Sequence, residues 1–192
     1  MAIGLMSELE AVNKILAVAG DSPVQTLDDD YIQADLALAV LTRASRRVQS
    51  AGWWFNEEES YPLIPDIGGL ITLGTNVISV VALNDAGTVV QRGNRLYDRQ
   101  ERTYVFTQQV LVDTILMLDW TELPQSAREH IVDVACTQYN NDFFGSNDIK
   151  QNLAKNEQMT YLILKQEDTD SRDVNMLSNS RSSSIAFRNR RG

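Results

Sequence analysis

Apolar residues recur with helical spacing at both ends of the chain and with strand-like spacing in its middle. Near the N-terminus, Ser7 and Glu10 have the spacing of a capping box, and Gly20 stands at the C′ position of a helix. Between them, apolar side chains follow one helix face at Leu9, Val12, Leu16 and Ala19. The pattern predicts an amphipathic helix over about residues 7–19.

A second helix is expected to open near Asp28 and to stop by Gly52. Its first turn would hold three acids, which favour the positive end of the helix dipole: Asp28, Asp29 and Asp30. Its last turns would hold three bases, which favour the negative end: Arg43, Arg46 and Arg47. The apolar middle, ADLALAVL, indicates burial among several neighbours.

From about Trp53 to Trp120 the pattern changes to short β-rich runs separated by turn formers. The runs are LITL at 70–73, VISVVAL at 77–83, TVV at 88–90, TYVF at 103–106 and VLVDTILML at 110–118. Glycine, proline and Asn-Asp segments lie between them. Four to six strands in a mainly antiparallel sheet are expected, in an order that the sequence does not give.

Helical spacing returns at Pro124, a residue suited to the first helical position. A regular apolar stripe follows at Ile131, Val134, Ala135 and Tyr139. Gly145 is the expected stop, and a fourth helix is expected from about Asn147 to Glu167. Its apolar positions have a weaker period: Ile149, Leu153, Met159, Leu162 and Ile163.

These elements predict an α+β protein, a bundle of about four helices with a β-rich insertion between the second and third. The expected bundle comprises residues 1–52 and 121–168, and the insertion comprises residues 53–120. Residues 169–192 are expected to form a flexible basic arm because they offer little apolar surface to offset the entropy of ordering.

Charge supports this division. The chain of 192 residues has a net charge of −9, but residues 171–192 hold five arginines and one acid. The remainder therefore has 12 basic and 25 acidic residues, a net charge of −13. Such an acidic body argues against a surface that grips nucleic acid through its phosphates. No apolar run approaches the ~20 residues of a membrane span, and no signal peptide is expected from the N-terminal pattern.

The sequence gives little support for a metal site or for a nucleophilic active site. One His and one Cys, without metal-ligand spacing, do not predict a metal site. His130 and Cys136 lie six residues apart on one predicted helix, so they should face different sides and not form a dyad. Neither a phosphate-binding loop nor another cofactor motif is present, and no cofactor is expected. Arg92, Arg95 and Arg99 surround Gly93, which favours a hairpin turn with solvated arginines or a subunit contact over an anion site.

The stretch SAGWWFNEEES, residues 50–60, sets aromatics against Glu57, Glu58 and Glu59. A polysaccharide-cleaving site would need two carboxyl groups across a cleft, and three consecutive glutamates do not show one. A cleft that placed Glu57 or Glu59 opposite Asp98 or Asp113 would favour that enzyme. The simpler interpretation is a helix end that leads into a strand, with solvated glutamates and with Trp53 or Trp54 buried.

Four blocks in order resemble one family. SELEAVNKILAVAGDSPVQTLDD at 7–29, RVQSAGWWFNEE at 47–58, RGNRLYDR at 92–99 and LPQSAREHIV at 123–132 are together similar to the tail tubular protein A family. These are head-to-tail adaptors of teseptimavirus-type short-tailed podophages. The resemblance covers about residues 7–165, and the segment after about 170 lies outside it.

The resemblance implies a structural virion protein, assembled in the host cytoplasm and not an enzyme. It implies a dodecameric ring between the portal protein and the tail nozzle (tail tubular protein B), with the tail fibre attached nearby. Double-stranded DNA would pass through the ring during genome retention and ejection, without specific binding. Membrane insertion is not implied.

Two hypotheses about residues follow from this role. Acids at Asp28, Asp29, Asp30, Glu57, Glu58 and Glu59 are expected to face the channel and to repel DNA phosphates. The basic arm is expected to contact the portal or an adjacent subunit through Arg172, Arg181, Phe187, Arg188, Arg190 and Arg191. The alternatives are an adaptor with added polysaccharide or peptidoglycan hydrolase activity, a DNA-binding or terminase-associated module, and an interaction domain of non-viral origin.

Overall fold

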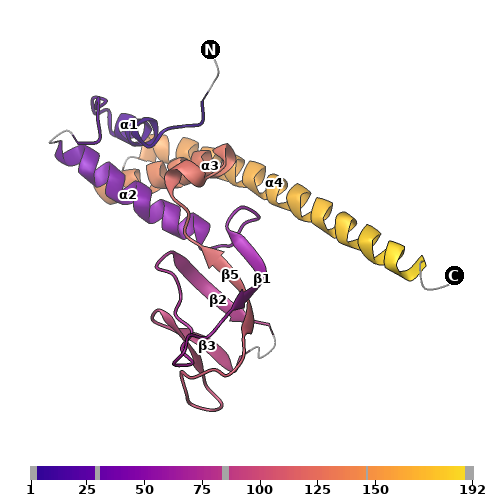
Figure 1. The fold of residues 1–192 in the computed structure, drawn as a ribbon. Coiled ribbons are helices and arrows are strands. Elements are labelled where there is room, and N and C mark those ends of the chain that lie inside the picture. The colour runs from indigo at the N-terminus through magenta and orange to yellow at the C-terminus, as the bar shows by residue number, and fades with distance from the viewer. Residues whose placement is uncertain (1–3, 29–30, 84–86, 146, 189–192) are drawn as a thin grey trace. The chain divides into compact units, whose positions relative to one another are not determined.

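The computed structural model describes residues 4–28, 31–83, 87–145 and 147–188, with the side chains of 144, 147–148 and 174–188 left out. Its helices are α1 (Glu8–Ala19), α2 (Ile32–Gln49), α3 (Gln125–Tyr139) and α4 (Asn147–Arg188). Its strands are β1 (Glu57–Leu63), β2 (Val77–Ala82), β3 (Val89–Arg92), β4 (Arg95–Asp98) and β5 (Val110–Leu116). The predicted α+β class, with strands inserted between the second and third helices, is confirmed (Figure 1).

The chain divides into two compact units. The helical unit consists of residues 1–44 and 124–192, and the β unit consists of residues 45–123. The last turns of α2 therefore belong to the β unit, whereas the sequence suggests that the bundle extends to residue 52.

The helical unit is built around α3, which packs against both α1 and α4. Most of α3 is buried, including Ile131, Val132 and Ala135. A salt bridge of 2.7 Å joins Lys14 of α1 to Asp133 of α3, and Ser126 of α3 donates a hydrogen bond to Glu167 of α4. These contacts fasten α1 and α4 to the same central helix.

The ends of α1 follow the sequence closely. Ser7 and Glu10 form the predicted capping box, and Gly20 adopts the left-handed conformation at φ 77°. The reversal between α3 and α4 uses a π-helical turn, Asn140–Phe144, followed by Gly145 at φ 62°. Local signals fixed both boundaries because a capping side chain and a left-handed glycine act within a single turn.

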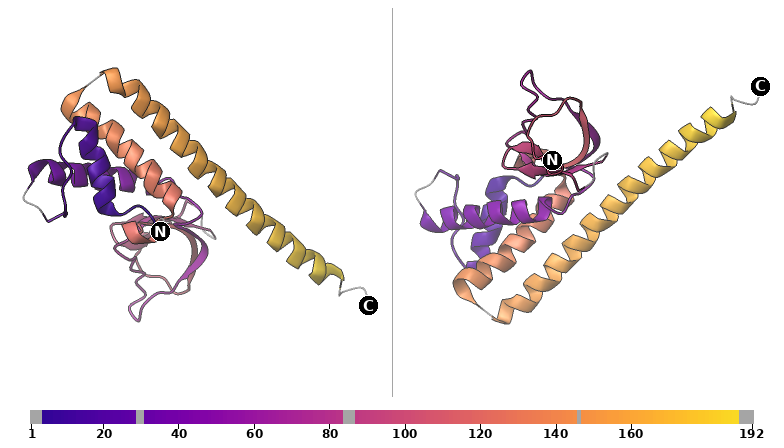
Figure 2. Two further views of the ribbon diagram at one scale, coloured as in Figure 1. Left: turned by 90° about the horizontal axis from the view of Figure 1, so that it is seen from above. Right: turned by 90° about the horizontal axis from the view of Figure 1, so that it is seen from below.

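Helix α4 is longer than the sequence suggests. It has 42 residues, from Asn147 to Arg188, and continues about six turns past the expected end at Glu167. Figure 2 shows α4 running well past α3 within the helical unit. Hydrogen bonds at i, i+4 spacing, Gln166 to Asp170 and Arg172 to Asp168, carry the helix across the point where the flexible arm was expected.

The β unit contains a three-stranded antiparallel sheet in the order β1-β5-β2 and a separate β3-β4 hairpin. Its core is a cluster of apolar side chains: Ile71, Leu73, Ala82, Val89, Leu96, Val110 and Val112. The predicted runs at 77–83, 88–90 and 110–118 overlap β2, β3 and β5. The runs at 70–73 and 103–106 form only isolated bridges: Leu70 pairs with Val105, and Thr72 and Thr103 pair with residues of β4.

Gly52 ends the α2 segment and admits the turn into β1. It adopts φ 76°, and a Cβ atom there would lie 2.9 Å from Ile115 Cδ1. Both the backbone conformation and the close approach therefore require glycine. Trp53 follows with 7% of its surface exposed, and its indole N–H donates to the Val48 carbonyl at 2.7 Å. The prediction that Trp53 or Trp54 is buried is confirmed by Trp53.

Two buried carboxamide side chains, those of Gln49 and Asn56, link the segments by which the chain enters and leaves the β unit. Gln49 is fully buried; its Nε2 donates to the Leu118 carbonyl at 3.1 Å, and its Oε1 accepts from the Leu118 N–H at 2.8 Å. Asn56 is 2% exposed, and its Nδ2 donates to the carbonyls of Gln49 and Leu116 at 2.9 and 2.8 Å. Asn56 Oδ1 also accepts from the Trp53 N–H at 2.9 Å. The carboxamides thus form hydrogen bonds with backbone groups that the β1–β5 pairing leaves without partners.

We predict that Asn56→Ala destabilises the β unit by about 2–4 kcal/mol, because it leaves buried backbone groups without partners. Urea unfolding followed by tryptophan fluorescence measures this, since all three tryptophans lie in the β unit. The control is Gln108→Ala, an exposed amide in the same unit, which should change the free energy of unfolding little. Equal effects of the two substitutions would contradict the role assigned to Asn56.

Candidate functional site

Three consecutive glutamates of the β unit, Glu57, Glu58 and Glu59, lie on β1, an edge strand of the sheet. Glu57 pairs with Ile115 and Glu58 with Thr114, and the register then shifts before Tyr61. Within this bulge Ser60 adopts φ 54°, and its N–H donates to Asp113 Oδ1 at 2.9 Å. Charged side chains and a bulge are common devices that protect an edge strand from pairing with other chains.

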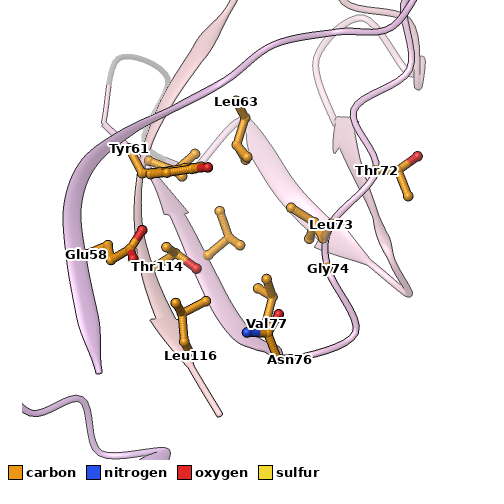
Figure 3. Close-up of a pocket in the computed structure, with 12 residues that line it drawn as sticks. Glu58, Tyr61, Leu63, Thr72, Leu73, Gly74, Asn76, Val77, Thr114 and Leu116 are labelled. Atoms are coloured by element: carbon orange, nitrogen blue, oxygen red, sulfur yellow. The ribbon is translucent and has the colours of Figure 1, made fainter. Parts of the chain in front are cut away.

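The three glutamates differ in their surroundings. Glu57 is half-buried, whereas Glu58 and Glu59 are exposed. Glu58 lines a pocket of about 360 Å³, where Figure 3 shows it beside Thr114 and Tyr61. The rest of the lining is largely apolar and includes Leu63, Leu73, Val77 and Leu116.

Neither of the two pockets described in the β unit pairs two carboxylates. Glu58 is the only acid in the lining of the first pocket. A second pocket of about 470 Å³ has Asp119 as its only acid, together with Arg46. A glycoside hydrolase site needs two carboxyl groups on opposite sides of the bond. The linings of these two pockets do not provide that arrangement.

The other two acids that would favour an enzyme have structural hydrogen bonds. Asp98 Oδ1 accepts from the backbone N–H groups of Gln100 and Glu101 at 2.8 and 3.0 Å. Asp113 is the acceptor for the Ser60 amide in the β1 bulge. Both carboxylates therefore stabilise local turns of the backbone.

The arginines around Gly93 form the predicted hairpin. Gly93 adopts φ 62° in the turn between β3 and β4. The guanidinium carbon of Arg92 lies 3.7 Å from the centre of the Tyr97 ring, and Tyr97 packs edge-on against Tyr104 at 4.7 Å. Arg99 donates to the Gly87 carbonyl at 3.3 Å. Arg92 is thus held by a cation–π contact and Arg99 by a hydrogen bond to the backbone.

The remaining candidate residues lie in the helical unit. Asp28 is exposed in the turn before α2, and Asp29 and Asp30 lie outside the described residues. Arg172 forms a 3.0 Å salt bridge with Asp168 on α4. The backbone of Arg181, Phe187 and Arg188 belongs to α4, but their side chains are not described, and Arg190 and Arg191 lie outside the described residues.

His130 and Cys136 are both buried in α3 and have different neighbours. His130 Nδ1 lies 3.2 Å from Thr160 Oγ1, and its ring packs against Tyr161. Cys136 Sγ lies 4.0 Å from the Lys14 carbonyl. Burial raises the pKa of the Cys136 thiol to about 12, so it is not a thiolate at neutral pH. His130 therefore contacts α4, whereas Cys136 contacts α1.

The described part of the chain contains no group of three or more His, Cys, Asp or Glu side chains that could hold a metal ion. Among the described helices, none is long and apolar enough to cross a bilayer.

Two helices carry exposed apolar side chains that the sequence pattern did not distinguish from core residues. Met159, Leu162 and Ile163 of α4 are exposed, although the sequence assigns them to the apolar face of that helix. Ile32 and Leu36 of α2 are exposed as well. The weak apolar period of the fourth helix was the available signal, because a helix with two apolar faces loses a single 3.6-residue period.

The described surface therefore combines exposed charged residues of the β unit with exposed apolar side chains on α2 and α4. A family model described as "Tail tubular protein" matches residues 9–174. The chain is also 31% identical to "Tail tubular protein A" of Klebsiella phage KP34 over 163 residues, which is 84% of this chain and 87% of that protein. The chain belongs to the tail tubular protein family and is a structural component of a phage tail.

Burial lowers the pKa of the His130 imidazole, and the nearby carboxylates of Glu157 and Asp133 oppose this only in part. The unfolded chain therefore binds a proton at a pH where the folded chain does not, and the helical unit should lose stability as pH falls below about 6.5. We predict that His130→Gln flattens this decline between about pH 7 and 5. Thermal unfolding followed by far-UV circular dichroism measures it, and an unchanged pH slope would contradict the prediction.

Proposed function

We propose that this protein is a head-to-tail adaptor, a ring that joins the portal protein to the tail nozzle and continues the DNA channel. The observation that carries the proposal is the family match over residues 9–174, which spans both the helical unit and the β unit. The similarity to a protein named tail tubular protein A supports the same role. The proposed ring is dodecameric and contacts the portal protein, the nozzle (tail tubular protein B) and the tail fibre.

We further propose that acids of the chain face the lumen of this ring. Asp28, Glu58 and Glu59 are exposed, and the chain before residue 171 has a net charge of −13. Like charge lining a channel repels DNA phosphates at short range and reduces adhesion as the genome passes. The exposure of these side chains supports the proposal, which also includes Asp29, Asp30 and the half-buried Glu57.

The C-terminal part of α4 is proposed to dock on the portal or on an adjacent subunit. Residues 171–192 carry a net charge of +4 on a chain that is otherwise acidic. A helix that extends past its packing partner α3 can present this charge to another protein (Figure 2). The contact residues would be Arg172, Arg181, Phe187, Arg188, Arg190 and Arg191.

Polysaccharide hydrolysis is not part of the proposal. Each of the two pockets described in the β unit contains one carboxylate, so no observation favours that second function.

We predict that electron microscopy of the protein mixed with the portal of the same phage shows a new ring-shaped layer beneath the portal. The portal alone is the control. A map of that layer with the β1 glutamates on the outer wall would end the proposal of an acidic lumen. Absence of any added layer would contradict the adaptor function itself.

We predict that truncation after Thr169 weakens binding to the portal while the helical unit stays folded. The reason is that the removed segment carries the positive charge, whereas the contacts among α1, α3 and α4 precede it. Portal binding is measured by co-sedimentation, and folding by circular dichroism. A matched full-length variant, with Gln in place of Arg181, Arg188, Arg190 and Arg191, separates charge from helix length. Portal binding by the truncated protein equal to that of the intact chain would contradict the prediction.

A further inference from the structure

The chain has a single histidine, His130, and it lies buried where α3 packs against α4. Its Nδ1 atom is 3.2 Å from Thr160 Oγ1, and its ring centre is 5.6 Å from that of Tyr161, so both contacts reach α4. Histidine is the side chain whose ordinary pKa falls between about pH 5 and 8. The one side chain of this kind in the protein therefore lies between two helices.

The contact with Thr160 fits a neutral imidazole. The Thr160 hydroxyl donates to the carbonyls of Asn156 and Glu157, at 3.1 and 3.2 Å, within its own helix. Because a hydroxyl has one proton, the Thr160 oxygen is left to accept a hydrogen bond from Nδ1–H of His130. A second proton on the ring would go to Nε2 and would place a positive charge on a side chain that is 6% exposed.

The charged groups that face this ring come from α3 and α4. Asp133 lies one turn further along α3, and Glu157 lies on α4. Asp133 is already paired with Lys14 of α1 at 2.7 Å. Burial lowers the pKa of His130 more than the two carboxylates and the backbone of Glu157 raise it. Protonation of His130 therefore weakens the contact between α3 and α4.

Helix α4 is joined to α3 by a turn that can act as a hinge. The two helices run side by side, with the π-helical turn Asn140–Phe144 and Gly145 at φ 62° between them (Figure 2). Helix α1 is fastened to α3 separately, by the salt bridge between Lys14 and Asp133. Elements with separate attachments can open one at a time, without unfolding of the whole unit.

We propose that His130 is a pH-sensitive latch: when it gains a proton, α4 detaches from α3 about the turn at residues 140–145, while α1 and α3 stay packed. This proposal does not depend on the adaptor function. Because the basic segment after Thr169 continues the same helix, release of α4 also changes how that segment is held.

The direction of the effect follows from the linkage between proton binding and opening. In the open state His130 is in water and has an ordinary pKa of about 6.5, whereas its pKa in the closed state is lower. Opening therefore becomes easier as pH falls below about 6.5, by at most about tenfold per pH unit. Once the pH is below the closed-state pKa, both states carry the proton and the effect levels off.

The test is amide hydrogen exchange of the full-length protein at about pH 7.5 and about pH 5, corrected for the pH dependence of intrinsic exchange. The opening constant of amides in residues 149–167 of α4 should rise about three- to tenfold at the lower pH. Amides of α1, Glu8–Ala19, should change little. An equal rise in both helices would show unfolding of the whole helical unit and would overturn the proposal.

Two substitutions in the same contact should have opposite effects. His130→Gln keeps a side chain that can donate to Thr160 but binds no proton in this range, so α4 should exchange equally at both pH values. Glu157→Gln removes a carboxylate that favours the protonated ring, so the closed-state pKa of His130 falls further and the rise in opening should be larger. The matched control is Glu59→Gln, an exposed acid of the β unit, which should leave the rise unchanged.

A pH response of His130→Gln as large as that of the unsubstituted chain would overturn the proposal, because the chain has no other histidine. A smaller rise in Glu157→Gln than in the unsubstituted chain would overturn it as well. Circular dichroism at about pH 7.5 first checks that each variant is folded. If His130→Gln does not fold, the comparison of Glu157→Gln with Glu59→Gln still decides the outcome.

Discussion

The hydrogen bonds of Gln49 and Asn56 hold together the segments where the chain enters and leaves the β unit. Gln49 belongs to the last turn of α2, and its carboxamide binds both backbone groups of Leu118 after β5. Asn56 joins the start of β1 to the end of β5 through the Leu116 carbonyl. Because these hydrogen bonds join the two ends of the insertion, its first and last strands are held next to each other. The antiparallel pairing of β1 with β5 and the Gly52 turn depend on this closure.

The β-rich runs of the sequence do not include β1, which was expected only as the strand that follows the helix end at residues 50–60. The segment EEESYPL lacks the alternating apolar residues that mark a strand, and it contains a bulge at Ser60. It is a strand because its backbone pairs with β5, which is a tertiary effect and not a local propensity. Nothing in the sequence distinguishes Gln49 and Asn56 from ordinary surface amides, so their hydrogen bonds between the two ends of the insertion could not be predicted. By contrast, β2 and β5 are rich in Val and Ile and were predicted near their observed bounds.

Helices were predictable to the extent that local signals define them. The start and end of α1 follow from Ser7, Glu10 and Gly20, which act within one turn. The end of α4 was wrong because no glycine or proline stops the helix between Gly145 and Arg188, and charge pairs such as Arg172 with Asp168 continue it. Met159 and Leu162 were assigned to an apolar face, but the sequence cannot say whether that face meets its own chain or another one. The proposed placement of Glu57–Glu59 around a lumen could not be derived from the sequence for the same reason, since it depends on neighbouring copies.

Charge and apolar surface act in opposite directions on the proposed assembly. Each chain before residue 171 has a net charge of −13, so copies in solution repel one another over roughly a Debye length, about 8–10 Å at moderate ionic strength. The exposed apolar side chains of α2 and α4 can attract another copy only at contact, because apolar burial has no long-range component. A portal that binds the basic end of α4 would hold copies side by side and remove the need for unaided encounter. On the proposed function, repulsion therefore keeps these apolar side chains of different copies apart until the portal brings the copies together, which favours one ring at the portal over aggregation elsewhere.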